Sequence, residues 1–330
     1  MDILIKTPKK KALVTGANGQ DGSFLSEYLL SKDYDVYGTI RRNSVAENQD
    51  IRISHLENKI QTEYADLTDI SSLERVLKSI MPDEIYNTAA QSHVRISFDL
   101  PHLTIQSNSV GVLNLMESYR YICPSARLLQ CSSSEMFGNT VDDDNFQRES
   151  TPMNPVSPYG ISKLFSYHLI RHYRRSYKLF AVNSICFNHE SSRRSTNFVT
   201  NKIVKAAVRI KLGLQDKLEL GNMDSFRDFG HSKDYVRAMN MLLNHSEPLD
   251  LIISTEETHS IREFCEITFS HLGMKYGDYV VQNQKFMRPE ELQYLRGSSQ
   301  RLRTLLGWKP EYSFTSMILE MIQFWEDYYK

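Results

Sequence analysis

The sequence predicts an α/β fold in which a doubly wound parallel sheet is followed by a smaller, mostly helical part. In the first half of the chain, short apolar runs typical of buried strands alternate regularly with amphipathic, helix-like segments. Such alternation favours a parallel sheet, because each new strand in the same direction needs a crossover, usually a helix. The alternation of strand-like and helix-like segments becomes less regular after about residue 188. We therefore expect the sheet over residues 1–188 and the smaller part over residues 189–330, with the chain crossing between them.

The elements follow in order along the chain. Apolar runs predict strands at Lys11–Thr15, Val36–Ile40, Ile60–Tyr64, Glu84–Ala89, Arg127–Cys131 and Phe180–Phe187. Helical spacing of apolar residues predicts the intervening helices Ser23–Ser31, Ser71–Ile80, Leu103–Tyr121 and Pro158–Tyr177. In the smaller part we expect helices at Phe198–Leu212, Lys233–Asn244, Ile261–Leu272, Ser299–Leu306 and Thr315–Tyr329, with short strands at Leu218–Leu220 and Leu251–Ser254.

Composition excludes several classes of function. The 330 residues carry 39 basic and 40 acidic side chains, a net charge of −1, which gives no general attraction to nucleic acid or anionic membranes. No apolar run approaches the roughly 20 residues of a membrane span, and the apolar run near the N-terminus is too short for a signal peptide. The four cysteines form no C-x-x-C pair and fit no zinc framework. We therefore expect a cytosolic protein without metal, nucleic-acid or membrane partners.

The turn after the first predicted strand has the spacing G-x-x-G-x-x-G, with Gly16, Gly19 and Gly22. Glycine permits a positive φ and a close approach of the backbone to a diphosphate, and the helix that follows offers unpaired N–H groups to the phosphates. Because the motif stands between a strand and a helix, a Rossmann-type dinucleotide site is the favoured interpretation. A tight turn without a ligand is the alternative.

The end of the second predicted strand indicates which dinucleotide is bound. NAD sites normally have an acidic residue there, which accepts a hydrogen bond from the ribose 2′-hydroxyl. This chain has Arg41 and Arg42 instead, and a guanidinium pairs well with the 2′-phosphate of NADP. We therefore predict NADP as the cofactor, with a solvated basic turn as the alternative. Asp66 and Leu67 follow the third strand, where contacts to the adenine are expected.

Four further residues form the candidate catalytic set. Tyr159 and Lys163 make a Y-x-x-x-K pair on one face of a helix. We expect the ammonium to lower the pKa of the tyrosine, so that Tyr159 acts as a base, and Lys163 to hold the nicotinamide ribose. Ser133 offers a hydroxyl to a sugar hydroxyl under oxidation. Glu135 is more specific, because hydride transfer needs no carboxylate base but removal of a proton next to a carbonyl does; a solvated loop residue or helix cap is the alternative.

With these motifs the chain resembles the GDP-mannose 4,6-dehydratases, a family of extended short-chain dehydrogenases/reductases, over nearly its whole length. The matching segments of the first half are GQDGS (19–23), IRRNS (40–44), DLTD (66–69) and AQSHVRISFDLP (90–101). The match continues through SSSEMFG (132–138), SPYGISK (157–163), FNHESSRRSTNFVTNKI (187–203), RDFGHSKDYVRAM (227–239) and RPEELQYLRG (288–297). The last three segments distinguish this family from other nucleotide-sugar epimerases and reductases.

The resemblance implies roles for individual residues. Those implied for NADP are Gly16, Gly19, Gln20, Asp21 and Gly22 at the phosphates, Arg41, Arg42, Asn43 and Ser44 at the 2′-phosphate, Asp66 and Leu67 at the adenine, and Ala89, Ala90, Gln91, Ser92, Tyr159, Lys163, His189 and Arg194 elsewhere on the cofactor. Those implied for GDP-mannose are Ser92, Ser134, Glu135, Asn188, Asn197, Val199, Lys202, Arg227, Arg288 and Glu291. In relatives the paired-arginine segment reaches a neighbouring subunit, so a homotetramer or homodimer is implied.

The implied reaction is an internal redox cycle that converts GDP-mannose into GDP-4-keto-6-deoxymannose, in deoxysugar biosynthesis toward GDP-fucose or GDP-rhamnose. Tyr159 would take the proton of the C4 hydroxyl while hydride passes to NADP. Glu135 would then remove the C5 proton and protonate the leaving C6 hydroxyl, and hydride would return to C6. NADP is not consumed in such a cycle.

The chain departs from the family pattern at several places, of which two concern the structure below. It has Ser133 where the family usually has threonine, and Thr255-Glu256-Glu257 where the family usually has T-G-E. Two alternative functions stay open. Another nucleotide-sugar epimerase or reductase of this fold would need no Glu135, and a catalytically silent NADP-binding regulator would be expected to lack the catalytic set. From His93 we expect a structural hydrogen bond and no catalysis.

Overall fold

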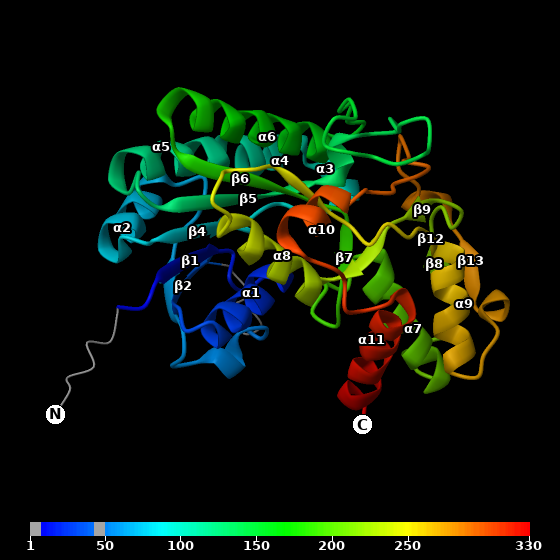
Figure 1. Cartoon of the computed structure of the whole chain (residues 1–330). Coiled ribbons are helices and arrows are strands. Elements are labelled where there is room, and N and C mark those ends of the chain that lie inside the picture. Colours follow the sequence, from blue (N-terminus) through cyan, green and yellow to red (C-terminus); the bar gives the residue numbers. More distant parts are fainter. Residues whose placement is uncertain (1–7, 43–49) are drawn as a thin grey trace.

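The structure, a computed structural model, describes residues 8–42 and 50–330 and has a seven-stranded parallel sheet at its centre (Figure 1). The strand order is β11-β6-β5-β4-β1-β2-β3, which confirms the predicted fold class. The strands are β1 (Lys11–Thr15), β2 (Asp35–Ile40), β3 (Gln61–Tyr64), β4 (Glu84–Asn87), β5 (Arg127–Ser133), β6 (Phe180–Cys186) and β11 (Leu251–Ile253). The order reverses between β1 and β4, and this reversal places a crevice at their carboxyl ends, where ligands of such sheets usually bind.

Helices cover both faces of the sheet. One layer contains α2 (Ile70–Ile80), α5 (Gly111–Ile122) and α6 (Pro158–Tyr177), and the opposite layer contains α1 (Gln20–Ser31) and α8 (Ser232–Leu243). Side chains alternate between the two layers along β1. Leu13 belongs to the apolar core beside α2, α5 and α6, while Val14 belongs to the core beside α1 and α8.

The remaining long helices pack on one another at one end of the molecule. α7 (Val199–Lys211), α9 (Ile261–His271) and α11 (Phe314–Tyr328) enclose a second apolar core, at the lower right of Figure 1. Three two-stranded ladders accompany them: β7 (Asn188–Glu190) with β10 (Phe229–His231), β9 (Phe226–Arg227) with β12 (His259–Ser260), and β8 (Leu218–Leu220) with β13 (Val280–Gln282). All of these elements lie at or after residue 188, and that they form a separate, smaller part stays a proposal.

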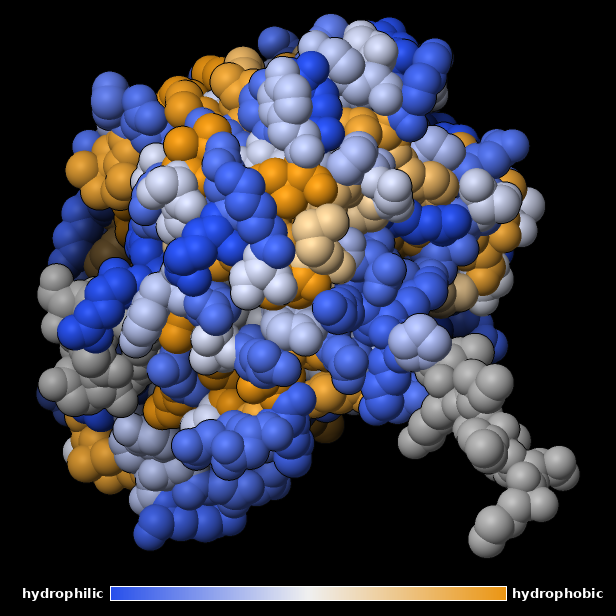
Figure 2. Space-filling view, turned by 90° about the vertical axis from the view of Figure 1, so that its left-hand side faces the viewer, coloured by the Kyte–Doolittle hydropathy of each residue, from blue (hydrophilic) through white to orange (hydrophobic). Residues whose placement is uncertain are grey.

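The surface is mixed in character. On the face that Figure 2 shows, hydrophilic and hydrophobic residues are interspersed. Within the described residues, no helix combines the length and apolar composition that crossing a bilayer would need.

Two segments that we expected in the smaller part lie in the sheet part instead. Leu251–Ile253 forms the edge strand β11, in which Ile252 lies opposite Ile185 of β6, and α8 packs against β5 and β6. The physical reason is burial: all three residues of β11 are inaccessible to solvent, and only the sheet part offers an apolar face there. The chain therefore returns to the sheet after β10, and the division at residue 188 stays a proposal about the two main parts.

The helix predicted over residues 103–121 is interrupted. A π-helical turn at Gln106–Val110 separates α4 (Pro101–Ile105) from α5. The Asn108 side chain in this turn holds the backbone of Gln91: its Oδ1 accepts from the Gln91 N–H (2.8 Å) and its Nδ2 donates to the Gln91 carbonyl (2.9 Å). π-Turns inside helices are frequent at functional sites, and this one fixes the loop that follows β4.

Glu256 stands where the family that this chain resembles usually has glycine, and its φ of +72° lies in the left-handed region. Its side chain makes contacts that glycine could not make. Oε1 accepts a hydrogen bond from the Ser299 N–H (2.8 Å) next to α10 (Gln300–Leu306), and Oε2 lies 3.5 Å from Arg303 Nη2. These contacts offset the strain of the left-handed conformation.

We expect Glu256→Ala to be less stable than Glu256→Gly by about 1 kcal/mol, because both variants lose the carboxylate and only alanine keeps the backbone strain. Both variants should be less stable than the natural chain, since hydrogen bonds to charged groups contribute about 1.5–3 kcal/mol. Urea unfolding followed by circular dichroism measures the order. An alanine variant as stable as the glycine variant would show that the backbone is not strained at this position.

Candidate active site

Two adjoining cavities lie at the carboxyl ends of the central strands, where the strand order reverses. The glycine-loop cavity, of about 320 Å³, lies over the turn after β1. The Tyr159 cavity, of about 260 Å³, lies over the ends of β5 and β6. The two share lining residues, which are Asp21, Thr88, Ala90, Ser92, Arg194 and Phe198. One elongated ligand can therefore extend from the first cavity toward the second.

The glycine loop leaves no room for side chains. Gly16 has a φ of +67°, and a Cβ atom on Gly22 would lie 2.3 Å from the Gly16 carbonyl oxygen. α1 begins at Gln20, three residues earlier than predicted, and Gly19 caps it without a side-chain hydrogen bond. The first turn of α1 therefore offers backbone N–H groups to the cavity, and this arrangement fits the diphosphate of a dinucleotide.

Asp21 and His189 connect the glycine loop to the smaller part. The His189 Nε2 lies 2.9 Å from Asp21 Oδ2, and its Nδ1 lies 2.7 Å from the Phe187 carbonyl oxygen. Burial opposes protonation, but the Asp21 carboxylate raises the pKa of His189 to about 9. The Gln20 amide donates to the His189 carbonyl (3.1 Å). The side chains of Gln20 and Asp21 thus bond to the segment after β6, which leaves their backbone N–H groups for the ligand.

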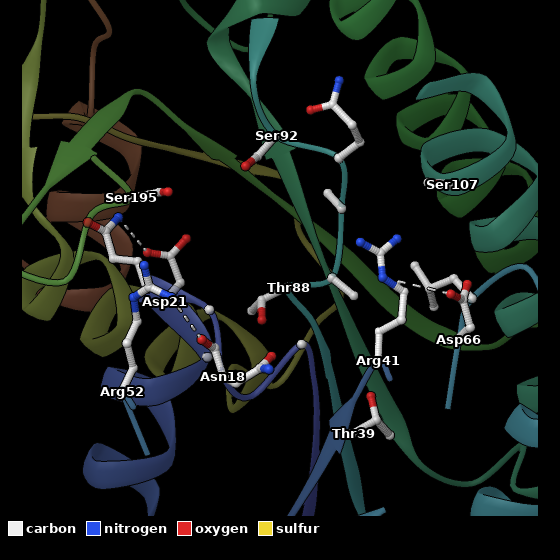
Figure 3. A pocket seen from close by; sticks show the side chains of 18 of the residues that line it. Asn18, Asp21, Thr39, Arg41, Arg52, Asp66, Thr88, Ser92, Ser107 and Ser195 are labelled. Atoms are coloured by element: carbon white, nitrogen blue, oxygen red, sulfur yellow. Dashed lines mark hydrogen bonds and ion pairs between the residues drawn. The ribbon is translucent and has the colours of Figure 1, made fainter. Parts of the chain in front are cut away.

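The adenosine end of the predicted cofactor site lies at the far side of the same cavity. Figure 3 shows Arg41 beside Asp66, with Nε and Oδ2 4.0 Å apart, and both residues line the cavity together with Leu67. Arg42 is exposed and lies outside the residues that line the cavity. The predicted Asn43 and Ser44 lie outside the described residues.

The strip after β4 forms one wall of the glycine-loop cavity. Ala89, Ala90, Gln91 and Ser92 all line it, as the sequence predicts. A Cβ atom on Gly16 would lie 3.0 Å from the Ala89 Cα, so the glycine loop and this strip are in close contact. The strip is held from behind by the π-turn asparagine described above.

The candidate catalytic residues all line the Tyr159 cavity. Ser133 ends β5, Glu135 follows it in a short 3₁₀ turn, and Tyr159 and Lys163 lie in the first two turns of α6. The Ser157 hydroxyl caps α6 through the Gly160 N–H (3.0 Å), and this cap fixes the start of the helix. The sequence prediction that these four side chains share one site is thereby supported by geometry.

The prediction that Lys163 lowers the pKa of Tyr159 is wrong for the protein without ligands. Burial raises the pKa of Tyr159 above its ordinary value, and a hydrogen bond with Ser133 opposes the rise only in part. The Lys163 Nζ donates to the Cys131 carbonyl (2.8 Å) and lies 5.8 Å from the centre of the phenol ring. Burial also lowers the pKa of Lys163. Desolvation therefore outweighs the attraction that sequence spacing suggests.

Glu135 is buried and only half paired. Its Oε1 lies 3.3 Å from Arg288 Nη1. Its Oε2 is buried and has no hydrogen-bond partner among the described residues. A buried carboxylate oxygen without a donor is costly and needs an explanation, and a ligand in the cavity supplies one. The burial of Glu135 rules out the alternative of a solvated loop residue.

The residues implied for a sugar nucleotide divide into two groups. Those that line the Tyr159 cavity are Ser92, Ser134, Glu135, Asn188, Asn197, Val199, Lys202 and Arg288. Arg227 and Glu291 lie outside the lining residues but contact Arg288 through a shared network. Arg227 Nη2 lies 2.9 Å from Glu291 Oε1, and Arg288 Nη1 lies 3.5 Å from the same oxygen. These two residues are placed to orient Arg288.

His93 makes the structural hydrogen bonds that we expected. Its Nδ1 accepts from the Ile96 N–H at the start of α3 (Val94–Asp99), and its ring packs against Phe198. In the part of the chain that the structure describes, no group of His, Cys, Asp and Glu side chains is arranged to hold a metal ion.

Among the residues that sequence reasoning missed, two help to shape the site. Asn108 lies within a predicted helix, where nothing marks a π turn. Arg52 lines the glycine-loop cavity but stands at no strand end and in no motif. The only available signal was a basic residue between two predicted strands, and this is common on protein surfaces.

Known proteins resemble this chain in sequence and in fold. The family model described as GDP-mannose 4,6 dehydratase matches residues 13–321. "GDP-mannose 4,6 dehydratase 2" of Arabidopsis thaliana is 45% identical, over 97% of this chain and 88% of the relative. The human GDP-mannose 4,6 dehydratase is 40% identical, over 96% of this chain and 91% of the relative.

Solved structures confirm the fold. That of RMD from Pseudomonas aeruginosa, complexed with NADPH, has a TM-score of 0.81 at 25% identity and covers 97% of this chain and 100% of that chain. That of a dTDP-glucose 4,6-dehydratase from Bacillus anthracis, in complex with NAD, has a TM-score of 0.82 at 22% identity and covers 96% of this chain and 97% of that chain. The family match over most of the chain and the 40–45% identities place it: this protein belongs to the GDP-mannose 4,6-dehydratase family, the extended short-chain dehydrogenases/reductases that use NADP.

Proposed function

We propose that this protein converts GDP-mannose into GDP-4-keto-6-deoxymannose by elimination of water. The observation that carries the proposal is the position of Glu135. Its carboxylate lies in the same cavity as Tyr159 and Ser133, and its buried Oε2 has no hydrogen-bond donor within the described residues. Removal of a proton next to a carbonyl needs such a base, whereas epimerization or simple reduction at C4 does not.

The chain's own residues suggest how the proton steps are divided. Tyr159 accepts the proton of the C4 hydroxyl, with Ser133 as hydrogen-bond partner of the phenol and the sugar oxygen. Glu135 removes the C5 proton and delivers a proton to the C6 hydroxyl as water leaves. Bound NADP would supply the hydride acceptor for C4 and the hydride donor for C6, and the proton that Tyr159 took from the C4 hydroxyl would balance the one that C5 regains. Exclusion of water by a substrate that fills the cavity would protect the keto intermediate.

The proposed cofactor site is the glycine-loop cavity. Gly16, Gly19, Gln20, Asp21 and Gly22 would hold the diphosphate through the loop and the first turn of α1. The strip Ala89–Ser92 with Lys163, His189 and Arg194 would line the path toward the nicotinamide. Arg41, with Arg42, would take the 2′-phosphate, and Asp66 and Leu67 would take the adenine. The roles of Asn43 and Ser44 stay predictions from the family resemblance.

Replacement of both Arg41 and Arg42 by alanine should weaken NADP binding about tenfold more than NAD binding, because only NADP has the 2′-phosphate that a guanidinium pairs with. Isothermal titration with the two dinucleotides measures the ratio. Arg75→Ala is the matched control, since Arg75 is exposed on α2 and pairs with Glu63 (2.8 Å). Equal weakening of NADP and NAD would reject the 2′-phosphate assignment.

The proposed substrate site is the Tyr159 cavity. Lys202 and Arg288 bring positive charge into it for the diphosphate of GDP-mannose. Arg227 and Glu291 would orient Arg288 from behind it, and direct contact of either residue with the nucleotide stays an expectation from the family resemblance. Ser92, Ser134, Asn188, Asn197 and Val199 would contact the sugar or the nucleoside.

The function is tested with purified protein, GDP-mannose and a catalytic amount of NADP. The expected product is smaller than GDP-mannose by one water and carries a 4-keto group, as mass spectrometry and NMR detect. The proposal fails if UDP-glucose is consumed and GDP-mannose is untouched. A 4-epimer or a reduced sugar as the product would instead favour the epimerase or reductase alternative, and binding of NADP without any turnover would favour a silent regulator.

We further propose a cytoplasmic homo-oligomer, a dimer or a tetramer. Apolar side chains on α4 and α6 are exposed, namely Leu103, Ile161 and Phe165, at 44–51% of their area, and the two helices are in contact. Burial of this strip against a second copy would remove it from water. Light scattering after size exclusion decides the question, and a monomeric mass at micromolar concentration would reject it.

A further inference from the structure

Arg52 links two segments of the glycine-loop cavity that lie far apart in the sequence. Its Nε donates to the Arg193 carbonyl oxygen (2.7 Å), and its Nη1 donates to the Asn18 carbonyl oxygen (3.4 Å). The guanidinium thus bridges the glycine loop and the segment after β7. In Figure 3 its side chain lies beside Asn18 and Asp21, at the end of the cavity away from Arg41.

Three guanidiniums gather at this end of the cavity. Arg193 Nη2 lies 2.5 Å from Glu27 Oε1, and Arg194 Nε lies 3.2 Å from Glu190 Oε2. Arg52, in contrast, forms no ion pair with a carboxylate of residues 8–42 or 50–330, and it donates hydrogen bonds to the two carbonyl oxygens named above. Burial, and then repulsion from the two other arginines, lowers the pKa of Arg52. A partly buried cation beside two like charges is unfavourable until an anion arrives.

NADP brings two anionic groups into such a cavity, the 2′-phosphate and the diphosphate. Arg41 and Asp66 lie together at the adenosine end. Arg194 lines both cavities, so the end that holds Arg52 and Arg194 is the one that continues toward Tyr159. A cofactor with its nicotinamide at Tyr159 and its 2′-phosphate at Arg41 must place its diphosphate between them.

We propose that Arg52 binds the diphosphate of the cofactor and, by holding the Asn18 and Arg193 carbonyls, closes the glycine loop against the segment after β7. The two carbonyls use only part of the guanidinium, which has five N–H donors in a planar fork. Because both contacts are in place without a ligand, the fork is oriented before the diphosphate binds, and less entropy is lost on binding. The inference rests on the proposed cofactor site.

The test is Arg52→Gln, with dinucleotide binding measured by isothermal titration at several salt concentrations. We expect the binding of NADP and of NAD to weaken by the same factor, because both dinucleotides contain the diphosphate. The factor should be about tenfold or more, since a charge-assisted hydrogen bond contributes about 1.5–3 kcal/mol. The dependence of affinity on salt should become shallower, since one ion pair is lost. Affinity for GDP alone should not change. Arg75→Gln, at an exposed position of α2, is the matched control.

Three outcomes would overturn the inference. Wild-type affinity of the variant would show that Arg52 does not touch the cofactor. Weaker binding of NADP with unchanged binding of NAD would place the guanidinium at the 2′-phosphate. Weaker binding with the natural salt dependence would show that Arg52 acts only by holding the two loops. Should Arg52→Gln fail to fold, Arg52→Lys keeps the charge and should show weaker binding of both dinucleotides with the natural salt dependence. Absence of all dinucleotide binding in the natural protein would instead reject the proposed function.

Discussion

Glu135→Gln should stop formation of the 4-keto-6-deoxy sugar while still allowing the first oxidation at C4. We expect product formation to fall by about 10³-fold or more, because one positioned acid–base group contributes about 10²–10⁴-fold and Glu135 is assigned two proton transfers. Glutamine keeps the size of the side chain and an oxygen for the contact with Arg288 (3.3 Å), so the cavity should keep its shape. Mass spectrometry of the nucleotide sugar measures the loss.

Two further measurements on Glu135→Gln separate a lost base from a damaged site. Absorbance at 340 nm should rise on addition of GDP-mannose to the NADP-loaded variant, up to about one equivalent for each site, because oxidation no longer proceeds to dehydration. In heavy water, deuterium should not appear at C5 of the recovered sugar. Glu74→Gln is the control, since Glu74 is half-buried on α2, lies outside both cavities and pairs with Lys78 (2.8 Å). Full turnover, or deuterium at C5, would remove Glu135 from its assigned role.

The sheet was predictable because its strands are buried and its helices are amphipathic. β1, with its run of apolar residues, and α6, with Ser157 as cap and Pro158 in the first turn, have the bounds that the sequence predicts. The placement of β11 was not predictable. Three apolar residues make a strand candidate in any part of the fold, and only the contact with β6 decides that Leu251–Ile253 extends the central sheet.

The site was predictable where a residue's chemistry coincides with its place at a strand end. Ser133 ends a strand of one parallel sheet, and Glu135 and the strip Ala89–Ser92 follow strands of the same sheet. Their convergence therefore follows from topology. Arg52 lines the site from a loop, and Asn108 acts on it from a π turn by holding the backbone of Gln91. The geometry of both segments depends on contacts across the fold. Electrostatics was the least predictable property, because the balance of desolvation and attraction depends on burial, which sequence spacing does not reveal.

Tyr159→Phe should abolish the reaction at its first step. We expect a loss of about 10³-fold or more in product formation, since the C4 hydroxyl would have no base, and no rise in absorbance at 340 nm with GDP-mannose and NADP. Phenylalanine fills the same volume, so affinity for NADP should stay close to that of the natural chain. Tyr177→Phe, an exposed position on the same helix, is the control. Accumulation of reduced cofactor in Tyr159→Phe would assign the base to another group.

The same variant tests where the base strength of Tyr159 comes from. Burial raises the pKa of this phenol in the chain alone, so Tyr159 should stay protonated in the ligand-free protein well above neutral pH. The ultraviolet spectra of the natural chain and Tyr159→Phe should then show no difference in phenolate absorbance near 295 nm up to about pH 9. A phenolate band at pH 8 in the ligand-free natural chain would mean that Lys163 alone activates the tyrosine. Its absence, together with turnover at pH 8, would mean that the tyrosine becomes a competent base only once ligands have filled the two cavities.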